Sequence, residues 1–183
     1  PLEEVTPSLR NKAKAVNFGI IYGISDYGLA QNLGISNQEA KEYIDAYFKR
    51  YPKVKDFIRE TIASARIQGY VTTLLNRRRY IPDINSKNYH LRSFAERTAV
   101  NTPIQGSAAD IIKIAMVNVY KALKENGLGA KILLQVHDEL ILDSRQEELS
   151  KVKDILKDCM EHAFSLKVPL TVDIHQGYTW EEL

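Results

Sequence analysis

The chain has 183 residues, of which 44% are hydrophobic and 26% are charged. It contains no secretory signal and no apolar stretch near the roughly 18 residues that a membrane-spanning helix needs, so we expect no membrane partner. The single cysteine, Cys159, excludes an internal disulfide and favours a reducing, cytoplasmic location. The net charge of +2 is unevenly distributed along the chain. Residues 61–109 carry seven basic and two acidic side chains, whereas residues 110–183 carry nine basic and thirteen acidic ones. The basic middle suits either phosphate binding or a solvated face.

The first part of the chain is predicted to be helical. Apolar residues recur at helical spacing in residues 9–22, and Gly23 can end that helix. Ser25 and Ser36 can cap the next two helices, the second with Glu39 in a capping box, and Pro52 suits the first turn of a fourth. The predicted helices are residues 9–22, 25–34, 36–50 and 52–69.

Short apolar runs then indicate strands. Residues 70–75 and 77–81 flank Asn76 as a hairpin, 82–88 read as a loop, and a helix to about residue 100 is interrupted by Pro103 before a longer one over 107–125. Residues 131–136 and 139–143 predict a buried hairpin with its turn at His137 and Asp138. A helix over 146–164 and a last strand over 170–175 complete an α+β arrangement, an antiparallel sheet covered by helices.

Four side chains of the first predicted helix stand four residues apart, so they line one side of it. They place two cations near the N-terminal end and two aromatic rings further along: Arg10, Lys14, Phe18 and Tyr22. Cations and a helix N-terminus can hold a triphosphate while rings pack against sugar and base. From spacing alone, a helix with solvated cations and buried aromatic rings remains the alternative.

The turn between the two C-terminal strands carries Asp138. Aspartate is common in tight turns for backbone reasons alone. The alternative is that the turn projects Asp138 from a rigid sheet toward divalent metal ions, which prefer carboxylate oxygens.

The literal strings resemble DNA polymerase family A, whose type member is bacterial DNA polymerase I. RNKAKAVNFGIIYG (residues 10–23) is similar to the helix of the fingers subdomain, and QVHDE (residues 135–139) is similar to the family's aspartate signature. The stretch from Ala95 to Asp110 also resembles the family. Phage-type RNA polymerases share related elements but carry His-Asp-Ser where this chain has His-Asp-Glu, so the DNA-synthesising branch fits better.

The resemblance implies a role for each matching residue. Arg10 and Lys14 would contact the incoming deoxynucleoside triphosphate, Phe18 would pack beside its sugar and base, and Tyr22 would sit on the template side. A phenylalanine at position 18 is similar to family members that tend to reject dideoxynucleotides. Asp138 would be a catalytic metal ligand for one of two Mg²⁺ ions, with Glu139 accessory and His137 near the primer terminus. Primer–template DNA would be bound by Arg79, Arg92, Arg97, Asn101 and Gln105.

The same resemblance implies a fingers subdomain over residues 1–88 and the C-terminal part of a palm subdomain over 89–183. It also implies a second metal-binding aspartate upstream of Arg10, in a motif resembling Asp-Tyr-Ser-Gln-Ile-Glu that does not occur here. Because the chain begins at Pro1 rather than Met, we expect it to be a segment whose further partner is the missing N-terminal part of the same polymerase, and to be inactive alone. A non-catalytic primer–template-binding module and a helical interaction domain are the alternatives from other classes.

Overall fold

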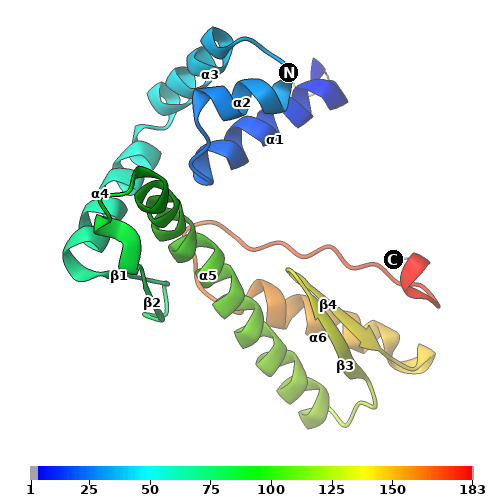
Figure 1. The fold of residues 1–183 in the computed structure, drawn as a ribbon. Helices are drawn as coiled ribbons and strands as arrows, with labels where there is room; N and C mark the ends of the chain where they lie inside the picture. Colours follow the sequence, from blue (N-terminus) through cyan, green and yellow to red (C-terminus); the bar gives the residue numbers. More distant parts are fainter. Residues whose placement is uncertain (1–3, 183) are drawn as a thin grey trace. The chain divides into compact units, whose positions relative to one another are not determined.

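A computed structural model describes residues 4–182 of the chain; residues 1–3, Pro1 among them, and residue 183 lie outside the described residues. The fold is α+β, with long helices and two small antiparallel sheets (Figure 1). The chain divides into two compact units, one ending at Gly106 and the other beginning at Ser107. This division falls inside a helix.

The first unit begins with three helices, α1 (Pro7–Ile21), α2 (Asp26–Leu33) and α3 (Asn37–Arg50). The predicted caps are confirmed: Ser25 accepts from the Gly28 amide, and Ser36 forms both halves of a capping box with Glu39. Leu29, Ala30 and Ala40 form the buried core of the three helices, and apolar side chains from α1 and α3 pack on it. The three helices are therefore held by one shared apolar cluster.

The rest of the first unit packs around a second cluster. Helix α4 (Pro52–Gln68) ends at Gly69, and β1 (Tyr70–Thr72) pairs with β2 (Arg78–Tyr80) in a short hairpin in which Asn76 has a left-handed backbone. Residues predicted as a loop form a 3-10 turn over Pro82–Asn85. The start of the long helix α5 (Tyr89–Glu125) closes the cluster. Its buried members are Ala65, Val71, Ile81, Ile84, Ala95 and Ala99.

Helix α5 runs without interruption through Pro103, so the predicted break there is wrong. A proline inside a helix removes one backbone hydrogen bond and clashes with the preceding turn, at a cost of about 3 kcal/mol. Buried residues lie on both sides of it, with Ala99 and Thr102 before and Ser107 after. The helix is therefore held inside the protein on both sides of Pro103, which a reading of the proline alone does not include.

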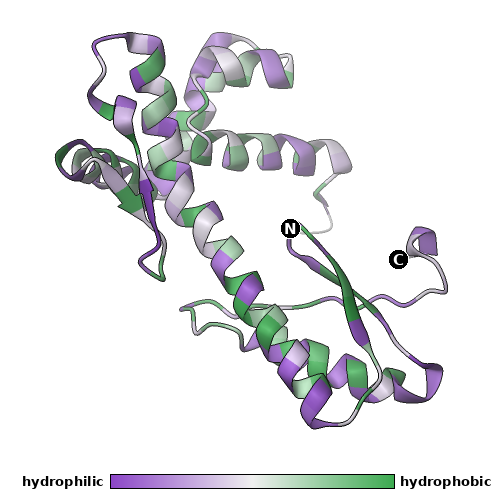
Figure 2. Ribbon diagram, turned by 60° about the horizontal axis from the view of Figure 1, so that its bottom comes forward, coloured by the Kyte–Doolittle hydropathy of each residue, from purple (hydrophilic) through white to green (hydrophobic). Residues whose placement is uncertain are grey.

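The second unit contains the rest of α5, the hairpin of β3 (Lys131–Val136) and β4 (Glu139–Asp143), and helix α6 (Leu149–Glu161). A register shift between Ile132 and Leu134 marks a bulge in β3. The apolar sides of α5, α6 and the hairpin meet at Val119, Leu123, Ala130 and Val152. Green and purple residues alternate around the helices in Figure 2, as amphipathic packing requires.

The predicted last strand over residues 170–175 is wrong, because this segment is extended but pairs with no strand in the described residues. Side chains of α6 hold the C-terminal segment in place instead. The Val172 amide donates to Glu161 Oε1 at 3.0 Å, and Lys153 Nζ donates to Gln176 Oε1. No helix within residues 4–182 has the length and apolar character needed to cross a membrane.

Candidate functional site

Helix α1 presents the predicted stripe of side chains to solvent. Thr6 caps it by accepting from the Leu9 amide, and Pro7 occupies its first turn. The only buried residues of α1 are Gly19 and Ile20, near its C-terminal end. Arg10 and Lys14 are exposed and form no ion pair within the described part of the chain. The alternative of buried aromatic rings does not apply, since Phe18 and Tyr22 are 50% and 44% exposed.

The two rings of the stripe stack on each other. Their centroids are 6.4 Å apart and their planes differ by 19°. They border a cleft of about 470 Å³ between α1, α2 and α5. A planar base or sugar can pack on such a pair of rings. The cleft is lined by Ala15, Phe18, Gly19, Tyr22, Gly23, Ile24, Ser25, Asn32 and Arg97.

Gly23 lets Arg97 lie against the end of α1. Its φ of +71° is in the left-handed region, and a Cβ placed on it would lie 2.7 Å from Arg97 Cγ. Glycine is therefore required here twice, by the backbone conformation and by the close approach. The result is that Arg97 enters the cleft beside Tyr22.

The continuity of α5 brings the predicted DNA-binding residues onto one face. Arg97, Asn101 and Gln105 are spaced four residues apart, about 6 Å per step along the helix. Arg97 and Gln105 are exposed, whereas Asn101 is half-buried and its Oδ1 atom has no hydrogen-bond partner among the described residues. The predicted break at Pro103 would have separated Gln105 from the other two.

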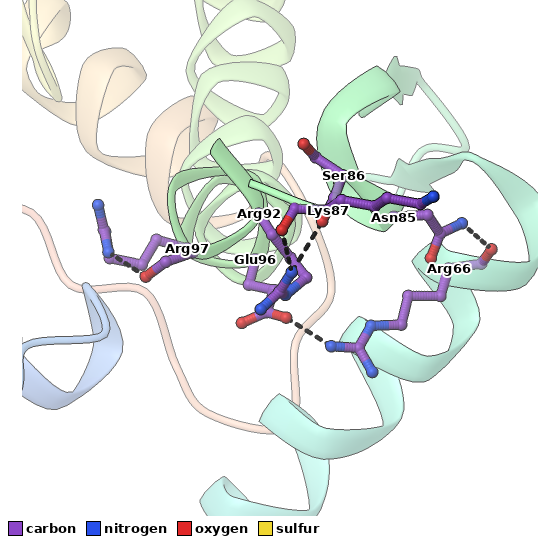
Figure 3. A network of polar contacts seen from close by, with 8 residues as sticks. Arg66, Asn85, Ser86, Lys87, Arg92, Glu96 and Arg97 are labelled. Carbon is purple, nitrogen blue, oxygen red and sulfur yellow. Dashed lines mark hydrogen bonds and ion pairs between the residues drawn. The ribbon is translucent and has the colours of Figure 1, made fainter. Parts of the chain in front are cut away.

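Other arginines of this region are engaged by the protein itself. Figure 3 shows Arg92 donating to the backbone carbonyls of Ser86 and Lys87, at 2.8 and 3.5 Å. In the same view Glu96 points toward Arg66, while Arg97 points away from that ion pair and donates to Ser93 at 2.8 Å. Arg92 therefore has fewer donors left for a phosphate than the exposed Arg97.

The three arginines before Tyr80 differ in their contacts. Arg77 donates to the Gly106 carbonyl at 3.0 Å, and the Arg78 guanidinium lies 4.7 Å from the Tyr70 ring centre. Arg79 is exposed and its Nη1 atom donates to Thr102 Oγ1 at 3.4 Å. This long contact leaves Arg79 the least engaged of the three in the contacts described.

In the second unit, Asp138 lies at the tip of the β3–β4 hairpin. Val136 pairs with Glu139, so His137 and Asp138 alone form the turn. His137 has a φ of +54°, a left-handed conformation that is uncommon for a residue with a side chain and is found disproportionately at functional sites. Gln135 Nε2 donates to the His137 carbonyl at 2.5 Å, which braces the turn. His137, Asp138 and Glu139 are all exposed.

Asp138 and Glu139 border a second cleft of about 520 Å³, between β4, α6 and the extended C-terminal segment. Asp173 and His175 of that segment line the same cleft. Carboxylate oxygens suit a hard cation such as Mg²⁺, so Asp138 and Glu139 fit as part of a metal site. Among residues 4–182, however, no three His, Cys, Asp or Glu side chains come together as a ligand set, so these residues do not complete one.

The residues of the α1 stripe and of the α5 face thus lie in the first unit, and those of the aspartate turn lie in the second. Sequence reasoning missed Asn32 and Ser25 as cleft residues. It offered no sequence argument for Asp173 as a metal ligand, and it read His175 as structural or on the surface. Only the position of Ser25 directly after the α1 stripe was a usable signal. The others reach their clefts through tertiary packing.

Comparison with known proteins gives concordant matches. Residues 1–182 match the family model "DNA polymerase family A". The chain is 59% identical over 178 residues to DNA polymerase I of Bacillus caldotenax and 58% identical over 181 residues to that of Caldicellulosiruptor bescii, covering 97% and 99% of this chain. It spans only 20% and 21% of the length of these relatives.

A solved structure is similar over the whole chain. It is described as the POL domain of Pol1 from M. smegmatis in complex with DNA primer-template and dNTP, and the match has a TM-score of 0.96 at 48% identity. The match covers 100% of this chain and 32% of that one.

Proposed function

The chain belongs to DNA polymerase family A, and from this premise we propose that it is part of a template-directed DNA polymerase that adds deoxynucleotides to a primer 3′-hydroxyl. Residues 1–88 would belong to the fingers subdomain and residues 89–183 to the C-terminal part of the palm. The observation that carries the proposal is the exposed stripe on α1, where two cations without ion-pair partners in the described residues precede a stacked ring pair.

The stripe would bind the incoming nucleotide. Arg10 and Lys14 would hold the triphosphate by charge-assisted hydrogen bonds, which are roughly twice as strong as neutral ones. Phe18 would pack on the sugar and base, and Tyr22 would lie on the template side of the new pair. Rotation of α1 would bring these groups over a correctly paired nucleotide.

The exposed face of α5 would contact the primer–template duplex. Asn101 and Gln105 carry amide groups, which can bond the acceptors that A·T and G·C pairs share in the minor groove without reading the sequence. Arg79, Arg92 and Arg97 would bind phosphates, as the basic count of residues 61–109 allows. His137 would lie near the primer terminus.

Asp138 would supply one ligand of the catalytic metal site, with Glu139 accessory. The other ligands, including a second aspartate, would come from the N-terminal part of the parent polymerase. The site completed in this way would hold two Mg²⁺ ions, whose charge would favour deprotonation of the attacking 3′-hydroxyl and stabilise the leaving oxygen. The primer 3′-oxygen would bond to the α-phosphorus as the bond to the β-phosphate oxygen breaks, releasing pyrophosphate.

We further expect the parent to act in the cytoplasm, where Cys159 stays reduced. Burial, with Asp158 nearby, raises the pKa of this thiol, so it remains protonated and poorly reactive. No other cysteine is available to it in this chain.

Binding and extension assays test the proposal together. We expect this chain to bind primer–template DNA with an affinity that falls as salt rises. We expect it to extend no primer alone in the presence of Mg²⁺, because the carboxylates of residues 4–182 do not complete a metal site. The parent polymerase should extend the same primer. Salt-independent binding would contradict the nucleic-acid role. Synthesis by the isolated chain would contradict the proposal that the metal ligands are shared between this chain and the N-terminal part of the parent polymerase. Binding without synthesis by the parent would favour the non-catalytic module.

A further inference from the structure

A hydrogen bond joins the nucleotide-contacting helix to α3. The hydroxyl of Tyr47 on α3 donates to Asn17 Oδ1 on α1 at 2.9 Å. Asn17 directly precedes Phe18 and lies three residues after Lys14, but it is outside the stripe that faces solvent. The bond therefore acts on the helix itself and leaves the nucleotide-facing groups free.

The Tyr47 ring is fixed by its own neighbours. Its centroid is 5.1 Å from that of Tyr51, and Phe48 meets it edge-on at 5.9 Å. Burial, and secondarily the neighbouring Tyr51, raises the pKa of Tyr47, so the hydroxyl stays protonated at neutral pH and can donate. A donor with a fixed ring can set the position of its acceptor.

Within the described residues, the buried contacts of α1 are concentrated in its C-terminal half. Its buried residues, Gly19 and Ile20, are near the C-terminal end, and Val16 is partly buried against the three-helix cluster. Val16 and Ile20 hold α1 on the cluster by apolar packing, and the hydrogen bond from Tyr47 adds a directional contact that narrows the orientation of the helix further. Asn17 is seven residues from Arg10 and Val16 is six, about 10 Å along the helix, so the hydrogen bond and the contact of Val16 together hold α1 at this distance from its N-terminal cation.

We propose that Tyr47 is a positioning residue for nucleotide binding, which through Asn17 sets the rotation of α1 and hence the direction of Lys14 and Phe18. This inference rests on the proposed function of the stripe. Tyr47 does not touch the nucleotide in this scheme. Tyr47 instead restricts the orientations of α1, so that Lys14 points toward the triphosphate in a larger fraction of them.

The test uses the parent polymerase and varies the concentration of one dNTP at saturating primer–template. Tyr47→Phe keeps the ring contacts and loses the donor. A net hydrogen bond of about 0.5–1.5 kcal/mol corresponds to a rise in the nucleotide KM of about 2- to 13-fold. The KM for primer–template should not change. Tyr51→Phe is the matched control: it removes a neighbouring hydroxyl for which the described residues show no hydrogen bond, so it should leave both constants unchanged.

Variants at the acceptor complete the experiment. Asn17→Leu removes the acceptor and should raise the nucleotide KM as Tyr47→Phe does. The double variant Tyr47→Phe/Asn17→Leu should be no worse than either single one. An unchanged nucleotide KM in Tyr47→Phe, an equal rise in the primer–template KM, or additive single effects would overturn the inference. Failure of the unaltered parent to extend any primer would instead overturn the proposed function, and the inference with it.

Discussion

The contact between Gly23 and Arg97 makes a quantitative prediction about stability. Gly23→Ala places a methyl group on a backbone with φ of +71° and 2.7 Å from Arg97 Cγ. An L-residue in the left-handed region costs about 1–2 kcal/mol. The atom that the methyl group meets is near the root of the arginine side chain, so the backbone or the whole side chain must shift, which costs about 1–3 kcal/mol. We expect a total loss of about 3 kcal/mol in the free energy of unfolding.

Gly34 provides the matched control. It has nearly the same φ, +65°, and no atom lies within 4 Å of a Cβ built on it. Gly34→Ala should therefore show only the backbone cost, about 1–2 kcal/mol. The difference between the two variants isolates the close approach of Arg97.

Urea denaturation of the isolated chain, followed by circular dichroism, measures both variants together with Arg97→Ala and the double variant Gly23→Ala/Arg97→Ala. Removing the arginine side chain beyond Cβ relieves the clash, so the double variant should be more stable than additivity predicts by about 1–3 kcal/mol. Equal losses in Gly23→Ala and Gly34→Ala, or strict additivity with Arg97→Ala, would refute the reasoning.

In the parent polymerase, Lys14→Ala should lower kcat/KM for the nucleotide by about 10- to 100-fold through loss of a charged hydrogen bond; an unchanged value in steady-state extension would remove Lys14 from the site. Asp138→Asn should reduce single-turnover extension by about 10³-fold, and a loss below tenfold would argue against a metal ligand. Arg97→Ala should lessen the slope of log affinity against log salt for primer–template DNA by about 1, whereas an unchanged slope excludes a phosphate contact. Leu29→Ala, at a fully buried position, should cost about 2–5 kcal/mol in urea denaturation, and a loss below 1 kcal/mol would contradict its place in the core.

Helix ends were predictable because their signals are local. Ser25 and Ser36 each bond a backbone amide three residues ahead, and Gly34 and Gly69 end their helices with left-handed backbones. Each of these interactions is complete within one turn of helix. The residues within one turn of the helix end therefore suffice to predict where the helix begins or ends.

The two wrong elements depend on residues distant in sequence. Pro103 is a helix breaker by its own chemistry, but the burial that carries α5 through it involves the tertiary core. Residues 170–175 have the composition of a strand, yet a strand exists only when a neighbour offers a ladder of hydrogen bonds. In the described residues, Glu161 takes one of those bonds with a side chain.

The candidate site divides in the same way. The α1 stripe follows from the helical period, so sequence alone could place Lys14 and Phe18 on one face, while the exposure of the Phe18 ring is a finding of the structure. The contact of Gly23 with Arg97 and the bond of Tyr47 to Asn17 join elements far apart in the chain, and no spacing rule predicts them. The side chains of the α1 stripe were predictable from the sequence, whereas the residues that hold this helix in place were not.

The bulge in β3 has a consequence for handling this chain at high concentration. Leu133 and Leu134 are exposed apolar residues on a strand, the kind of surface on which chains add to one another edge to edge and aggregate. The register shift between Ile132 and Leu134 in the pairing with β4 marks a bulge, and a bulge bends its strand and increases the local twist, which opposes edge-to-edge addition. We expect an incoming strand to pair poorly beside the exposed Leu133 and Leu134. The bulge would thereby hinder the hairpin that carries Asp138 from forming intermolecular sheets.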